Sequence, residues 1–226
     1  MNKTIKFRLL LIITIFSLLL ANCEKESGLP RDGDGNVYDT IRIGTQTWLA
    51  ENLKTTKYNN GVSIPLVTDN DQWISTTSAA FCWYGNNQGL VKNDYGALYN
   101  WWAAKLPYLC PVGYRVPARE DWVTLIDFLG GENIAGGKLK ITGTIFWEND
   151  MLASNESGFS AVGGGVREHN AGTFHSLRKY GYWWNTSLGV DEANGRRIML
   201  SQYSTVAELG GLNKKTGMSV RCIKND

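Results

Sequence analysis

The sequence predicts an α+β domain with two main helices and small antiparallel sheets, joined by long ordered loops. A hairpin pattern comes first, two helical patterns follow it, and short strand patterns fill the rest of the chain. This order along the chain is typical of α+β domains. The content of nine Trp and 25 Gly suits the same class, because aromatic side chains supply core area where helices are few.

The amino terminus has the layout of a secretory signal peptide over residues 1–22. Lys3, Lys6 and Arg8 form a short basic stretch, and an apolar run follows from Leu9 to Ala21. The run falls about a third short of the roughly 20 apolar residues that a spanning helix needs. We therefore expect the leader to be cleaved.

The leader ends Leu20-Ala21-Asn22-Cys23, which resembles the lipobox of bacterial lipoproteins, although Asn22 stands where a small residue is usual. The resemblance implies lipidation at Cys23 and contact with a membrane through that lipid; plain secretion or an uncleaved anchor are the alternatives. Residues 23–36 then form a tether, and its acidic start, Glu24-Lys25-Glu26-Ser27, resembles tags for surface export. We expect a cell-envelope, outer-membrane lipoprotein, exposed at the surface.

Without the leader, the chain is long enough to form one domain with a full hydrophobic core. We assign that domain to residues 37–226. The formal net charge is only +2, and part of it belongs to the leader. A nucleic-acid-binding protein normally carries a basic face. We therefore exclude nucleic acid as the main partner.

The first element of the domain is a hairpin over residues 37–48, with alternating polarity and a turn at Gly44-Thr45. Before it, Asp32, Asp34 and Asn36 alternate as in a calcium loop, but position 41 is Ile where an EF-hand needs Glu. We expect a solvated turn there. Residues 49–54 read as a tight connection and residues 59–61 as a turn.

Two helices and several strands follow. Leu98, Trp101 and Trp102 lie at helical spacing and predict a helix over 96–104. A second helix is predicted over 117–130, because it has Pro at its start, acidic residues in its first turn and glycines at its end. Short strands are predicted over residues 158–167, 180–187, 196–200 and 217–223.

Several of these segments together resemble the Fibrobacter succinogenes major paralogous domain (FISUMP), a family common in Bacteroidetes lipoproteins. The matching segments are Asp39–Leu53, Phe81–Tyr84, Tyr95–Trp101, Leu109–Pro117 with Trp122, and Met218–Cys222. That family is similar in turn to the C-type lectin-like fold and to the formylglycine-generating enzyme group, through residues 113–122 and 219–222. The resemblance implies a C-type lectin-like fold and no particular activity.

Three cysteines remain besides Cys23, and an odd count leaves one thiol unpaired in an exported protein. In the C-type lectin-like fold a disulfide often joins the start of the main helix to the last strand. The resemblance therefore implies a bridge between Cys110 and Cys222. Cys82 would then be a buried thiol beside aromatic residues.

Enzyme chemistry finds little support, so we expect no catalytic residues, no metal and no cofactor. His169 and His175 are six residues apart, which does not match a helical metal pair. Nothing places Glu156 and Glu168 at a common site for glycoside hydrolysis. There is no Gly-x-Ser-x-Gly elbow, and residues 163–165 lack the Lys-Ser/Thr of a phosphate loop.

The calcium motifs of sugar-binding lectins, Glu-Pro-Asn, Gln-Pro-Asp and Trp-Asn-Asp, are also missing from the sequence. We therefore expect a non-catalytic binding or adhesion module for a glycan or protein, with a structural surface protein as the alternative and an enzyme of unknown chemistry third. Loops on a stable core are the usual binding surfaces, which favours residues 165–179 and 188–197. The candidate ligand-binding residues are His169, Phe174, His175, Arg178, Asp191 and Asn194.

Overall fold

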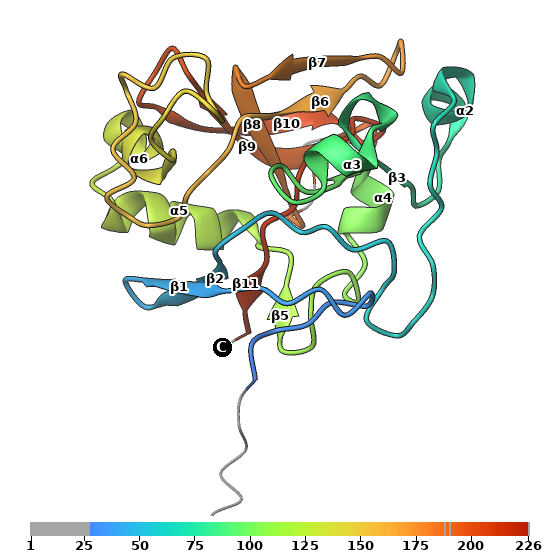
Figure 1. Ribbon diagram of the computed structural model, residues 1–226, viewed down its shortest axis with the longest axis horizontal. Coiled ribbons are helices and arrows are strands. Elements are labelled where there is room, and N and C mark those ends of the chain that lie inside the picture. Colours follow the sequence, from blue (N-terminus) through green and yellow to red (C-terminus); the bar gives the residue numbers. More distant parts are fainter. Residues whose placement is uncertain (1–27, 188, 190, 226) are drawn as a thin grey trace, which may run out of the picture.

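The computed structural model describes residues 28–187, 189 and 191–225, so the predicted leader and Cys23 lie outside the described residues. The domain mixes short helices with small antiparallel sheets, which confirms the α+β class (Figure 1). In chain order the elements are β1 (Thr40–Ile43), β2 (Gln46–Leu49), α2 (Asn70–Ser75), β3 (Phe81–Cys82), η1 (Tyr84–Asn86), α3 (Gln88–Val91), β4 (Leu98–Tyr99), α4 (Trp101–Ala104), β5 (Tyr114–Arg115), α5 (Arg119–Phe128), α6 (Glu132–Leu139), β6 (Gly164–Arg167), β7 (Phe174–Leu177), β8 (Tyr180–Asn185), β9 (Asn194–Ser201), β10 (Ala207–Asn213) and β11 (Ile223–Lys224).

One sheet brings the two ends of the domain together. Its strand order is β1-β2-β11-β5, so the last strand lies between the opening hairpin and β5 (Figure 1). Ile41 pairs with Trp48 in the hairpin, as the alternating pattern predicts, and the Trp48 side chain is fully buried. Ile223 in β11 pairs with both Trp48 and Arg115.

A second sheet, ordered β10-β9-β8, packs one face against α5 and α6. Trp183 pairs with Ile198, and both side chains lie in a buried cluster with Trp122 and Leu125 of α5 and Leu139 of α6. Side chains alternate between the two faces of a strand, so Tyr182 and Trp184 belong to the opposite face. One face of this sheet therefore packs against α5 and α6, and the other face, with Tyr182 and Trp184, contacts a different part of the core.

The helix predicted over 117–130 is confirmed as α5, which begins at Arg119. Asp121 fixes this start, because its carboxylate accepts hydrogen bonds from the backbone N–H of Ala118 at 2.6 Å and from Arg115 at 2.9 Å. Trp122 and Leu125 form part of its buried stripe.

The helix predicted over 96–104 is largely wrong. Leu98 and Tyr99 form β4, and only the four residues from Trp101 are helical. Gly96 has φ +74°, and a Cβ there would lie 2.7 Å from the carbonyl oxygen of Leu53, so the chain turns too closely for a helix. Asn100 then caps α4 by accepting a hydrogen bond from the Ala103 N–H at 3.0 Å.

The sequence patterns missed α2, α3, α6, η1 and the strands β3, β5, β7 and β10. In α6 the cause is Gly136 and Gly137, which disfavour a helix. Gly136 is needed for packing, because a Cβ there would lie 2.5 Å from the carbonyl oxygen of Val206. The predicted strand over 217–223 is also only partly correct: Met218 and Ser219 form single bridges, and regular pairing begins at Ile223.

The turn before the hairpin differs from the solvated turn that we predicted. Asp32 is only 7% exposed. Its carboxylate accepts hydrogen bonds from the backbone N–H groups of Asp34 and Asn36, from the Asn36 amide, and from the Tyr38 hydroxyl at 2.6 Å. The buried Asp32 carboxylate therefore holds the turn together through these hydrogen bonds.

The C-terminal segment is fixed to the core in two ways. A disulfide joins Cys110 to Cys222, as the family resemblance implies, and Cys82 is a buried free thiol whose pKa is raised to about 12 by burial. Next to the bridge, the fully buried Arg221 donates to Asn52 Oδ1 at 3.0 Å and to the Phe159 carbonyl oxygen at 2.7 Å.

Loss of the disulfide should destabilise the fold strongly. The bridge spans 112 residues of chain, and closing a loop of this length is worth about 4–5 kcal/mol in the chain-entropy model. Replacing Cys110 and Cys222 together by Ala should lower the free energy of unfolding by that amount in urea titrations followed by tryptophan fluorescence. Dithiothreitol should reproduce the loss in the wild type and leave the double variant unchanged. A wild type insensitive to reduction would contradict the expectation.

Candidate functional site

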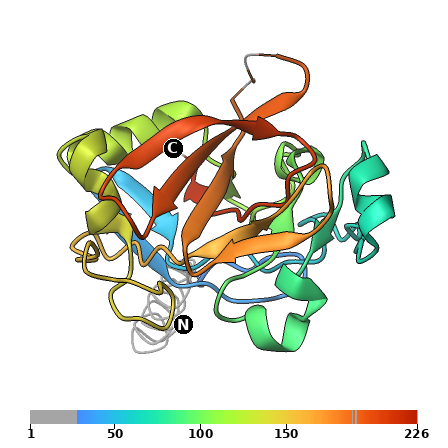
Figure 2. The ribbon, with the colours of Figure 1, turned by 90° about the horizontal axis from the view of Figure 1, so that it is seen from above.

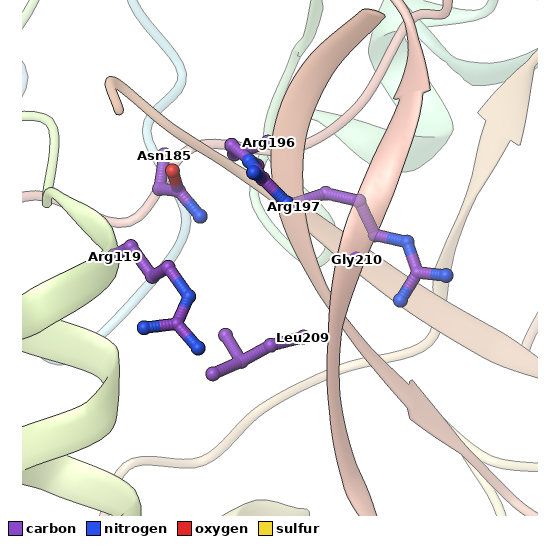
Figure 3. Close-up of a pocket in the computed structure, with 6 residues that line it drawn as sticks. All are labelled: Arg119, Asn185, Arg196, Arg197, Leu209 and Gly210. Carbon is purple, nitrogen blue, oxygen red and sulfur yellow. The ribbon is translucent and has the colours of Figure 1, made fainter. Parts of the chain in front are cut away.

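A small concave site lies where the start of α5 meets the end of the β8–β10 sheet. Figure 3 shows this cavity of about 80 Å³, which we name the arginine pocket. It is lined by Arg119, Asn185, Arg196, Arg197, Leu209 and Gly210.

Two hydrogen bonds hold the walls of the arginine pocket together. The backbone N–H of Arg119, the first residue of α5, donates to Ser187 Oγ at 2.8 Å. The N–H of Thr186, just after β8, donates to the carbonyl oxygen of Pro117 at 2.9 Å. The helix start and the strand end are therefore fixed relative to each other.

Asn185 is the buried polar residue of the arginine pocket, with only 1% of its surface exposed. Its Oδ1 accepts a hydrogen bond from the Ser187 N–H at 3.3 Å, whereas its Nδ2 has no partner among the described residues. In Figure 3 this amide nitrogen points toward the space between Arg119 and Arg196. A buried donor without a partner costs about 1–3 kcal/mol of stability, so an acceptor bound in the pocket would be stabilised by the Asn185 Nδ2 group.

The two adjacent arginines of β9 point in different directions. Arg196 pairs with Asn185, which puts both side chains on the face of the sheet that meets α5. Arg197 belongs to the opposite face, and Figure 3 shows its guanidinium directed away from Arg119. There it donates to the Glu208 carbonyl oxygen at 3.1 Å and pairs with the Glu208 carboxylate.

The opposite face of the same sheet carries a group of aromatic rings, Tyr180, Tyr182 and Tyr203, which we name the tyrosine surface. The rings of Tyr180 and Tyr182 stack with their centroids 6.0 Å apart, and Tyr203 lies 6.0 Å from Tyr180. Tyr203 is 61% exposed, and the Arg197 guanidinium carbon is 6.0 Å from the Tyr182 ring centroid. This surface offers apolar rings beside an ion pair.

The candidate residues predicted around 165–179 contact different parts of the chain. His175 is exposed on β7, where its Nε2 lies 2.7 Å from Glu168 Oε1. The Phe174 ring packs 5.4 Å from that of Tyr84. Arg178 adopts φ +62° and donates to the carbonyl oxygen of Thr144 at 2.6 Å.

The other predicted group lies elsewhere. The Asp191 carboxylate accepts hydrogen bonds from the backbone and side chain of Asn194, and these bonds lower its pKa. In Figure 2 the described chain leading into β9 projects at the top of the view, away from the β6–β7 hairpin. The structure does not bring the two groups together, and a role for His169 or the others in ligand binding stays a prediction.

The acidic and metal-ligating residues are dispersed in the described part of the chain. Glu156 pairs with Lys138 at 3.2 Å and Glu168 pairs with His175, so the two carboxylates have different partners. No three His, Cys, Asp or Glu side chains among the described residues are grouped as metal ligands. The arginine pocket instead collects N–H donors, a chemistry suited to holding an anion.

Sequence reasoning missed both surfaces, although it located α5, β8 and β9, which carry most of their residues. The alternation of Tyr180 and Tyr182 on one strand was a usable signal, because residues two apart share a face. No local pattern signals the convergence of Arg119 and Arg196, which are far apart in sequence and meet only through tertiary packing.

Comparison with protein families matches the chain to the Fibrobacter succinogenes major domain over residues 41–224. Comparison with curated proteins found no match, and neither did comparison with solved structures. Within residues 28–187, 189 and 191–225, no helix is long and apolar enough to cross a membrane.

Proposed function

Because the chain belongs to the Fibrobacter succinogenes major domain family, we propose that it is a cell-envelope lipoprotein whose domain binds a glycan without catalysis. The observation that carries the glycan proposal is the tyrosine surface. Sugar rings have an apolar C–H face that packs on aromatic rings, while their hydroxyls pair with charged groups. The exposed Tyr203 ring and the half-exposed carboxylate of Glu208 supply both kinds of contact.

We further propose a C-type lectin-like fold for the domain. The supporting observation is the disulfide from Cys110, just before the main helix, to Cys222 beside the last strand. The glycan contact proposed here does not use the calcium chemistry of lectins. It depends on ring stacking and hydrogen bonds alone.

Removal of the Tyr203 ring should abolish glycan recognition. The full-length protein in detergent, applied to a glycan array, should lose at least tenfold in apparent affinity for its bound glycans on Tyr203→Ala, because the most exposed stacking ring is gone. Tyr108→Ala is the matched control, since Tyr108 is also half exposed but lies outside the tyrosine surface. Its binding should equal that of the wild type.

Two outcomes would contradict the glycan proposal. If Tyr203→Ala binds glycans as the wild type does, the tyrosine surface is not the site. If no glycan on the array is bound, a pull-down from envelope proteins separates a protein ligand from a purely structural surface protein.

We propose that the anchor is a lipid on Cys23, supported by the sequence Leu20-Ala21-Asn22-Cys23. Cells fed radiolabelled palmitate should incorporate label into the wild-type chain and into Cys82→Ala, but not into Cys23→Ala. Label retained in Cys23→Ala would refute lipidation at this residue.

A further inference from the structure

We propose that the arginine pocket binds a carboxylate group of a ligand, independently of any glycan contact at the tyrosine surface. The observation behind this site is the Asn185 amide, which is buried, unpartnered at Nδ2 and directed into the cavity. A buried N–H donor without an acceptor is costly, and an oxygen of a bound anion would satisfy it.

The charge around the pocket favours an anion. Arg119 is exposed at the mouth and Arg196 lines the wall on the same side of the sheet as Asn185. Arginine binds carboxylates through paired N–H groups, which gives both strength and orientation. The N-terminal end of the ten-residue helix α5 adds a positive field at the same place.

Two of the acidic groups near the pocket pair with other arginines, and a third, Glu120, lies beside the pocket wall. Asp121 is held by Arg115, and Glu208 is held by Arg197 on the other face of the sheet. Glu120, at the start of α5, accepts a hydrogen bond from the Ser187 hydroxyl at 3.4 Å. The lining of the cavity thus holds the guanidinium groups of Arg119 and Arg196 against this one nearby carboxylate.

The size of the cavity selects a small group. A volume of about 80 Å³ suits a carboxylate on a short stem. Leu209 supplies an apolar wall against which the stem would pack. The ligand is therefore a carboxylate that projects from a larger molecule or a free small carboxylate.

Saturation-transfer NMR of the full-length protein in deuterated detergent tests this site at constant ionic strength. The probes are acetate, D-glucuronate and the neutral control D-glucose. Acetate and D-glucuronate should bind, and Arg119→Gln should weaken both by at least tenfold. Arg42→Gln removes the same charge from an exposed position on β1 and should bind as the wild type does.

A second variant separates binding from folding. Asn185→Leu keeps the volume of the side chain but removes the unpaired donor, so it should lose binding while its melting temperature stays equal or rises. Tyr203→Ala should bind acetate normally, which keeps this test distinct from that of the glycan proposal. Tighter binding of D-glucuronate than of acetate would assign the carboxylate to a sugar, and equal binding would assign it to a free small carboxylate.

The proposal is overturned by any of three results. These are the absence of saturation transfer to both carboxylates, an equal loss of binding in Arg42→Gln, and wild-type affinity for acetate in Asn185→Leu.

Discussion

The fully buried guanidinium of Arg221 is the contact on which the rest of the domain depends. It donates to the carbonyl oxygen of Leu49 in the opening hairpin and to that of Phe159. It also donates to Asn52 Oδ1, which accepts a further hydrogen bond from Trp183 Nε1 at 2.8 Å. Burial lowers the pKa of Arg221, and a buried charge is tolerated only when its donors are satisfied. The segments that supply these acceptors must therefore assemble around it.

This network explains how two unrelated surfaces share one sheet. Trp183 ties β8 to the Arg221 centre, and the residues on either side of it, Tyr182 and Trp184, face the other way. At the end of β8, Asn185 reaches the arginine pocket, while the tyrosine surface begins with Tyr180 at its start. A single rigid strand thus positions an aromatic surface on one face and a pocket of N–H donors on the other.

The sequence was informative where local chemistry decides the structure. The hairpin and α5 follow from alternation and from the acidic first turn, and the family resemblance supplied the Cys110–Cys222 pairing. Local patterns failed where the conformation depends on segments far away in the sequence. At Gly96 and Gly136 the carbonyl group of another segment lies so close that a side chain would not fit. The arginine pocket was not predictable for the same reason, since α5 and β9 create it only when they meet.

The most direct test of this account is the free energy of unfolding of Asn52→Ala, measured by urea titration beside the exposed control Asn170→Ala. Removal of the Asn52 amide leaves the Nε and Nη2 donors of Arg221 and the Trp183 N–H without the acceptor that they share, so a loss of about 3 kcal/mol or more is predicted. The control should stay within about 0.5 kcal/mol of the wild type. A similarly small change in Asn52→Ala would contradict the central role of the Arg221 network.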